Sequence, residues 1–188
     1  MFDPIALAET AVSTYLATGQ QARVPDDLPD EWKRPGAVFV CVKKNGQLRG
    51  CIGTYAPTRA SLAEEVIHNA VNSATDDPRF PAVSKDELAG LEFSVDVLEP
   101  PEQIYTVDDL DTRIYGVIVR AGARVGLLLP DIQGVDTIEQ QVAIARRKAG
   151  ISPVEAVELF RFKIRRYENA HGVEKNLPVG ELVDDSLS

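Results

Sequence analysis

The dipeptide Asn45-Gly46 constrains the fold of this 188-residue chain more than any other short segment. It separates two runs that are rich in β-branched and apolar residues, over positions 37–44 and 47–54. Asn-Gly between such runs is the strongest short signal for a β-hairpin with a two-residue turn, because both residue types tolerate positive φ angles. The sequence therefore predicts an antiparallel pair of strands here.

A two-residue turn would also set the register of this hairpin. Lys44 would pair with Gln47, and Val40 would pair with Cys51. Since successive side chains on a strand point to opposite faces, Cys41 and Cys51 are expected on opposite sides of the sheet. A disulfide between these two residues, the only cysteines of the chain, is therefore not expected.

The same register divides the hairpin side chains between two faces. A core face is expected to hold Phe39, Cys41, Leu48 and Ile52. A second face is expected to combine an apolar base with a cation, a thiol and a residue without a side chain: Val38, Val40, Val42, Arg49, Cys51 and Gly53. This second face would leave room for something to approach it.

The second strand contains the unusual hexapeptide Leu48-Arg49-Gly50-Cys51-Ile52-Gly53, which is typical of a functional site. Glycine inside a strand marks a bulge or a close backbone approach, here by a ligand or by a neighbouring helix. For Cys51, burial as a packed thiol is one interpretation. The other is catalysis by a thiolate that Arg49 stabilises, which would need a base such as His68.

Arg49 requires a partner, since an unpaired buried cation is costly. It would form either an ion pair with Asp77 or Glu92, or a fork for a carboxylate or phosphate ligand. The segment 77–80 (Asp-Pro-Arg-Phe) either closes the preceding helix, with Asp77 paired to Arg79, or turns Arg79 toward the same ligand. The candidate ligand-binding residues are Arg49, Gly50, Gly53, Asp77 and Arg79.

Periodicity and capping signals predict the other elements. Helices are expected after Asp3-Pro4 up to Gly19, over 59–74 and over 137–149, with a short helical turn at 84–87; strands are expected over 91–98, 114–121, 124–129 and 157–167. A hairpin followed by a helix occurs twice. This order favours a two-lobed α+β fold, with mostly antiparallel sheets and packed helices, over a doubly wound parallel sheet.

Composition excludes several classes of function. A net charge of −9 disfavours non-specific binding to nucleic acid or to an anionic membrane. A contact with RNA through Arg146, Arg147 and Lys148 is a weaker alternative, because no aromatic stacking platform accompanies these cations. The two cysteines and two histidines are not spaced as metal ligands, and no cofactor is expected.

The sequence shows no secretory signal and no apolar run of roughly 20 residues that could span a membrane. A cytoplasmic protein with two reduced thiols is therefore expected.

The hexapeptide, together with several segments downstream, resembles the AMMECR domain family, whose prokaryotic members are called AmmeMemoRadiSam system protein A. The resemblance runs from the first predicted helix to about Tyr167. It continues in register through Asp77-Pro78-Arg79-Phe80, Glu87-Leu88, Leu98-Glu99-Pro100-Pro101, Gly126-Leu127-Leu128-Leu129-Pro130 and Lys148-Ala149-Gly150. It implies one domain over residues 1–168, made of two interlocked subdomains. The residues from Asn169 onward are themselves expected to form a C-terminal tail over 169–188.

The resemblance also implies a setting for the protein. The hexapeptide would lie near a cleft between the lobes, where it would bind an anionic or peptide ligand. Memo-like and radical S-adenosylmethionine proteins would be its partners in a modification pathway. Because the chain lacks a Cys-x3-Cys-x2-Cys motif, any radical chemistry would come from a partner. The alternative is a non-catalytic protein–protein adaptor.

The sequence departs from the family pattern at two places. Tyr115-Gly116 stands where a His-Gly pair is often found, and Arg146 stands where a cysteine is common. A mechanism that uses that histidine or that second cysteine is therefore not expected here.

Overall fold

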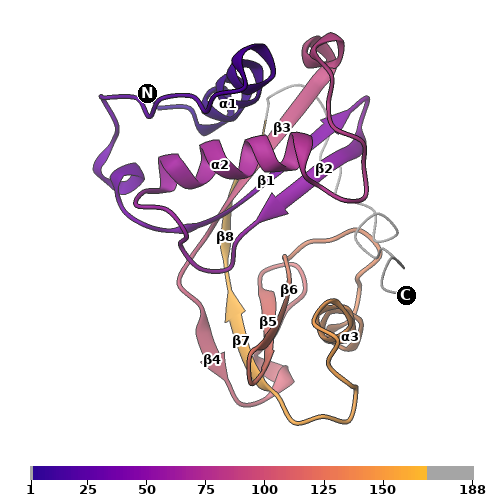
Figure 1. Cartoon of the computed structure of the whole chain (residues 1–188). Coiled ribbons are helices and arrows are strands. Elements are labelled where there is room, and N and C mark those ends of the chain that lie inside the picture. Colours follow the sequence, from indigo (N-terminus) through magenta and orange to yellow (C-terminus); the bar gives the residue numbers. More distant parts are fainter. Residues whose placement is uncertain (1, 169–188) are drawn as a thin grey trace. The chain divides into compact units, whose positions relative to one another are not determined.

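The computed structural model describes residues 2–168 of the chain (Figure 1). The tail expected over 169–188 lies outside the described residues. The described part divides into two compact units. Unit 1 comprises the residues up to Leu98 and those from Arg165, and unit 2 comprises Glu99–Ile164.

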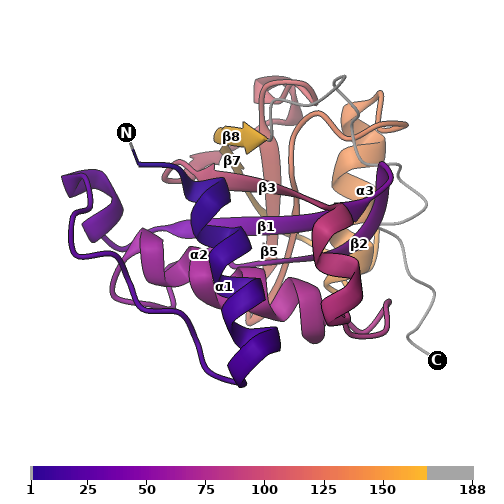
Figure 2. The ribbon, with the colours of Figure 1, turned by 90° about the horizontal axis from the view of Figure 1, so that it is seen from above.

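Unit 1 contains a four-stranded sheet with the strand order β2-β1-β3-β8, in which β1 pairs antiparallel with β2 and with β3. Helices α1 and α2 cover one face of this sheet (Figures 1 and 2). The elements are α1 (Pro4–Thr18), β1 (Ala37–Lys44), β2 (Gln47–Gly53), α2 (Leu62–Thr75), β3 (Leu91–Leu98) and β8 (Ile164–Glu168), with 3-10 helices over Asp30–Lys33 and Lys85–Gly90.

Local signals account for where these elements begin and end. The Asp3 side chain accepts the Ile5 N–H at the start of α1, and Gly19 ends the helix with a φ of 73°. The predicted turn between β1 and β2 is confirmed, with φ angles of 54° at Asn45 and 75° at Gly46.

Helix α2 begins three residues later than the sequence predicted. Ser61 caps it by accepting the Glu64 N–H. The buried carboxylate of Glu65 accepts the backbone N–H groups of Thr58 and Arg59, at 2.9 Å each. Thr58 and Arg59 therefore belong to a loop before the helix, which the Glu65 carboxylate holds in place, and not to the first helical turn.

The core of unit 1 lies between the sheet and the two helices. Its fully buried side chains include Val38, Val40 and Val42 of β1, which pack with apolar residues of α1, α2 and β3. The prediction that Phe39 and Cys41 face this core was wrong. The valines form the helix-facing side, and the odd-numbered residues of β1 point away from it.

Unit 2 contains a second antiparallel sheet, with the strand order β4-β7-β5-β6, and one helix that contacts β5 and β6 (Figure 1). Its elements are β4 (Glu102–Ile104), β5 (Gly116–Ala121), β6 (Arg124–Leu128), α3 (Ile138–Lys148) and β7 (Glu158–Phe162), with a 3-10 helix over Val107–Asp109. The predicted hairpin and the predicted helix capped by Thr137 are confirmed.

The strand predicted over 157–167 is two strands in two different sheets. β7 ends at Phe162 and pairs with β4 and β5, whereas β8 belongs to the sheet of unit 1. Lys163 separates them, and its carbonyl accepts the Glu99 N–H at 2.9 Å. The alternation of apolar and basic residues continues through both strands, so it gives no signal of this change.

Candidate functional site

A β-bulge at Arg49 changes the register that the turn alone predicts. Lys43 pairs with Leu48 as expected, but Val42 pairs with Gly50, so Arg49 is an extra residue on β2. The shift brings Cys41 directly opposite Cys51.

The two cysteines form a disulfide across the hairpin, with a Cα–Cα distance of 4.0 Å. The predictions of opposite faces and of two free thiols were both wrong, because the bulge moves Cys51 by one position relative to β1. Cys51 is half-buried, and Cys41 is buried. With its sulfur bonded to Cys41, Cys51 carries no thiolate in this state. Its catalytic role stays a prediction for the reduced protein.

Arg49 forms a dense set of contacts with the segment that follows α2. Its Nε and Nη2 donate to the carboxylate of Glu87 at 3.2 and 3.1 Å, and its Nη1 and Nη2 donate to the backbone carbonyls of Pro81 and Ala82, at 2.5 and 3.2 Å. The expected partners Asp77 and Glu92 were therefore wrong. The bulge turns Arg49 toward the 3-10 helix that contains Glu87, 38 residues further along the chain.

The carboxylate of Glu87 is held ionised by these contacts. Hydrogen bonds from Arg49, from the Ser84 N–H and from Lys44 lower the pKa of Glu87 to about 2. Arg49 and Glu87 have only 14% and 19% of their side-chain surface exposed. The charge of Arg49 is therefore already matched within unit 1.

Asp77 and Arg79 cover the backbone of β2 at Cys51, on the side where β2 is the edge strand among the strands of residues 2–168. Asp77 Oδ2 accepts the Cys51 N–H at 2.9 Å, and Arg79 Nη2 lies 3.5 Å from the Cys51 carbonyl oxygen. The predicted pair between Asp77 and Arg79 is confirmed at 2.7 Å. These two side chains thus replace a neighbouring strand, which protects an otherwise open edge.

Burial of Asp77 acts to raise the pKa of its carboxyl group. Hydrogen bonds from the Arg79 side chain and from the Cys51 and Arg79 N–H groups outweigh that effect and hold the pKa below its ordinary value. Asp77 therefore remains a carboxylate that is matched by Arg79.

The two glycines of the hexapeptide admit parts of the protein itself. A Cβ added at Gly50 would lie 1.8 Å from the carbonyl oxygen of Ser73 in α2, and one at Gly53 would lie 2.1 Å from the Phe39 ring. The Ser73 hydroxyl also donates to the Val40 carbonyl and accepts the Ile52 N–H. The close approach that the sequence predicted is therefore made by a helix at Gly50 and by an aromatic ring at Gly53.

His68 lies on α2 among other polar groups. Its Nε2 is 2.9 Å from Arg59 Nη2 and 3.1 Å from Asn72 Nδ2. Burial and the nearby charge of Arg59 lower the pKa of His68 below its ordinary value. This favours the neutral imidazole. Among the described residues, the hydrogen-bonding partners of the His68 ring are Arg59, Asn72 and Gln21, which all belong to unit 1.

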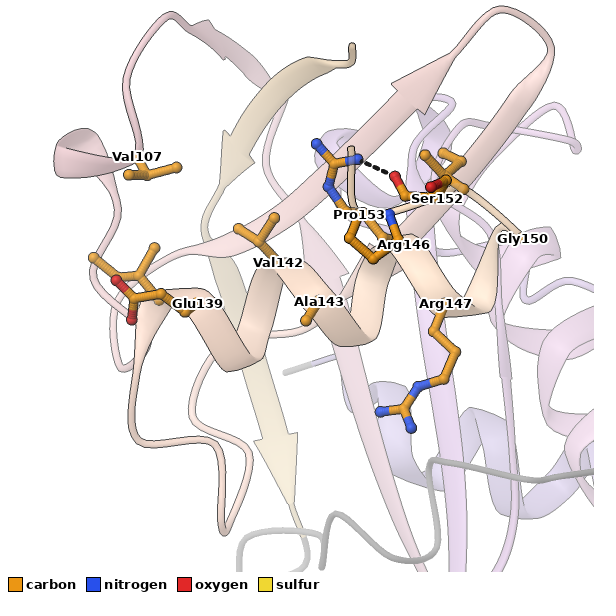
Figure 3. A pocket seen from close by; sticks show the side chains of 11 residues that line it. Val107, Glu139, Val142, Ala143, Arg146, Arg147, Gly150, Ser152 and Pro153 are labelled. Carbon is orange, nitrogen blue, oxygen red and sulfur yellow. Dashed lines mark hydrogen bonds between the residues drawn. The ribbon is translucent and has the colours of Figure 1, made fainter. Parts of the chain in front are cut away.

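The sequence did not reveal a groove of about 750 Å³ in unit 2 (Figure 3). Along α3, two residues in each turn line it, and the rest comes from the segments after α3 and β4. The lining residues are Val107, Ile138, Glu139, Val142, Ala143, Arg146, Arg147, Gly150, Ile151, Ser152 and Pro153. The opposite side of α3 is buried through Gln141, Ile144 and Ala145. The only sign of this groove in the sequence is that the side of α3 opposite its buried residues also carries apolar residues.

Arg146, one of the cations proposed to contact RNA, is held by the loop after α3. Its Nη1 donates to the carbonyl oxygens of Ser152 and Glu155 at 2.7 and 3.0 Å. Figure 3 shows this side chain turned toward the loop, whereas Arg147 extends away from the helix. The RNA contact stays a prediction.

The described residues lack two further kinds of feature. Residues 2–168 contain no group of three or more histidine, cysteine, aspartate or glutamate side chains that could hold a metal ion. Within the same residues, no helix combines the length and the apolar character that a membrane crossing requires.

Two antiparallel sheets with packed helices define an α+β protein, as the sequence predicted. Comparison with family models identifies it further: the model described as AMMECR1 matches residues 5–171. The chain therefore belongs to the AMMECR1 family.

The chain is also similar to individual proteins of known sequence or structure. A protein of Thermotoga maritima is 48% identical over 160 residues, which cover 84% of this chain and 92% of that one. A longer protein of Clostridium acetobutylicum is 44% identical over 171 residues, 89% of this chain and 36% of its own length. The crystal structure of the uncharacterized protein PH0010 from Pyrococcus horikoshii matches with a TM-score of 0.81 at 34% identity, covering 89% of this chain and 90% of that one.

Proposed function

We propose that this protein is a non-catalytic protein–protein adaptor that assembles through the groove beside α3. The observation that carries the proposal is the groove itself, because its volume of about 750 Å³ is lined by Val142, Ala143 and other apolar residues. Apolar grooves along a helix are a common way to bind a helix of another chain.

The contacts of the hexapeptide support this choice. Arg49 is matched by Glu87, and Arg79 is matched by Asp77. A peptide or anion at the hexapeptide would have to compete with these internal carboxylates. Such binding by Arg49, Gly50, Cys51, Gly53, Asp77 and Arg79 stays a prediction, and the contacts favour a structural role for these residues.

The proposed setting is a cytoplasmic modification pathway, the AmmeMemoRadiSam system, with Memo-like and radical S-adenosylmethionine proteins as partners. It rests on the family resemblance and on the need for a partner to supply any radical chemistry. The adaptor would bind the proteins of this pathway and would not itself catalyse the reaction.

Capture of the Memo-like and radical S-adenosylmethionine proteins of the same genome tests the proposal. Ala143→Glu places a charge in the centre of the groove at an exposed helical position, where glutamate is a good helix former. This variant should lose capture while keeping its unfolding temperature. Ile114→Glu is the matched control, since Ile114 is 50% exposed in the same unit and does not line the groove. Equal capture by wild type and Ala143→Glu would show that the groove is not the assembly surface.

A further inference from the structure

We propose that the groove along α3 is occupied by the α3 helix of a second copy of this chain. The inference rests on the proposed function, because it concerns the same groove: a second copy fills the groove of the free protein, and a pathway protein would take the place of that copy. The free protein is then a symmetric dimer in which each copy supplies the same helix face.

Three residues that line the groove form one exposed ridge along α3. Glu139, Ala143 and Arg147 are spaced four residues apart, and all three are exposed. Residues at this spacing are neighbours on a helix surface and form the ridges that helices use to pack. Figure 3 shows Glu139 and Arg147 toward opposite ends of α3, with Ala143 between them.

The ridge is complementary in charge to its own reversed copy. A twofold axis through Ala143 would place a second α3 antiparallel to the first. Glu139 of each copy would then face Arg147 of the other, which gives two equivalent ion pairs. This is the requirement for an isologous interface, in which one patch must complement itself.

The remaining lining fits the close approach of two helices. Ala143, at the proposed axis, is small enough for the helix backbones to come near each other. Val142 and Pro153 supply apolar surface beside the ridge. A polyanion would fit less well, because Glu139 lies at one end of the groove.

Both charged ends of the ridge are available for a partner. Within residues 2–168, neither Glu139 nor Arg147 forms an ion pair, whereas Arg146 beside them is bound to the carbonyls of the following loop. The orientation of the second helix should therefore be set by Glu139 and Arg147, since interface charges act mainly on orientation and specificity.

Charge reversal on the full chain tests this arrangement. Wild type, Glu139→Arg and Arg147→Glu are each examined by sedimentation velocity over a range of concentrations, and the two variants are then mixed in equal amounts. Each single variant should dimerise at least about tenfold more weakly, because two attractive pairs become repulsive. The mixture should recover the wild-type affinity, because the arginine introduced at position 139 of one variant would face the glutamate introduced at position 147 of the other.

The mixture also controls for damage to the helix, because it contains the same two altered chains. Asp26→Arg, an exposed charge reversal in unit 1, should dimerise as wild type does. A wild-type chain that stays monomeric, a single variant with wild-type affinity, or a mixture that does not recover would each overturn the inference. A monomeric wild type combined with loss of partner capture in Ala143→Glu would overturn the dimer and leave the adaptor proposal standing. Dimerisation with the expected charge pattern, combined with unchanged capture by Ala143→Glu, would support the dimer and overturn the adaptor proposal.

Discussion

Each unit contains a β-hairpin with a helix packed across its second strand, and the two contacts are built alike. Gly50 of β2 lies against the backbone of Ser73 in α2, and Gly126 of β6 lies against the backbone of Ala145 in α3. An added Cβ would be 1.8 Å from the helix carbonyl oxygen in the first case and 1.9 Å in the second. In both units, a glycine allows helix backbone to touch strand backbone.

A second likeness lies on the strands themselves. Gly53 pairs with Phe39 in unit 1, and Gly116 pairs with Phe162 in unit 2. In each pair the aromatic ring occupies the space that a side chain on the glycine would fill. Such a ring supplies the packing that the glycine lacks.

The difference between the hairpins lies in the residues around these glycines. The hairpin of unit 1 has a bulge, a disulfide and a set of ion pairs at Arg49 and Asp77, whereas β5 and β6 pair without any shift of register. The comparison therefore explains Gly50 and Gly53 as packing residues, since glycines in unit 2 make contacts of the same kind. Arg49, Cys51 and Asp77 are particular to unit 1, and any function of the hexapeptide depends on them.

The glycine–helix contact should give the largest effect. Gly50→Ala and Gly126→Ala should each lower the free energy of unfolding by about 3 kcal/mol, because a backbone carbonyl cannot move aside as a flexible side chain can. Unfolding in denaturant measures both. Gly90→Ala is the control, since nothing lies within 4 Å of its added Cβ. If either substitution lowered the free energy of unfolding by less than about 1 kcal/mol, the glycine–helix contacts of the two units would not be equivalent.

The disulfide should give the next largest effect, and it has no counterpart in unit 2. Reduction of the Cys41–Cys51 bond, which closes a short loop with a sequence separation of 10, should lower the free energy of unfolding by about 2–3 kcal/mol. The reduced wild type should match the Cys41→Ser/Cys51→Ser variant. Reaction of two thiols per chain with a thiol reagent, before any reductant is added, would contradict the cross-strand bond.

The glycine–phenylalanine pairs should show a smaller effect that differs between the units. Gly53→Ala and Gly116→Ala should each cost about 1–2 kcal/mol, because the ring must shift. Gly116→Ala should cost more, since Phe162 is 2% exposed and Phe39 is only half-buried. A double-mutant cycle sharpens the test: Gly53→Ala should cost less in a Phe39→Leu background, and equal costs in both backgrounds would mean that the ring is not the obstacle.

The smallest effect concerns the ion pair at the bulge. Glu87→Gln should lower the free energy of unfolding by about 1 kcal/mol at pH 7, because Arg49 loses its carboxylate. The pKa of Glu87 is about 2 in the folded protein and 4.5 ordinarily, so its stabilisation is present above about pH 4.5 and is lost as the pH falls toward 2.

Glu158, which pairs with Arg120 in unit 2, is the comparison for Glu87. The side chains of Arg120 and Glu158 are both more than 40% exposed. Glu158→Gln should therefore lower the free energy of unfolding at pH 7 by less than Glu87→Gln does. The free energies of unfolding of wild type and of both variants, measured at pH 7 and at pH 3, distinguish the two ion pairs. A difference between wild type and Glu87→Gln that does not shrink at low pH would contradict the assigned pairing.

The sequence predicted the two hairpins, the three helices and the α+β class, because these depend on residues close together along the chain. Asn45-Gly46 specifies a turn, Thr137 caps a helix, and the alternation from Leu91 specifies a strand. It also predicted the Asp77–Arg79 pair, whose members are two residues apart.

Only the tertiary structure decided what the hexapeptide contacts. The bulge at Arg49 moves Cys51 opposite Cys41, and Gly50 beside it meets the backbone of α2. The partner of Arg49 is 38 residues away, so no local pattern could select Glu87 over another carboxylate. The groove beside α3 also depends on segments that meet only in the folded chain. Turns, caps and strand patterns are local, whereas register shifts, ion partners and grooves are set by packing between distant segments.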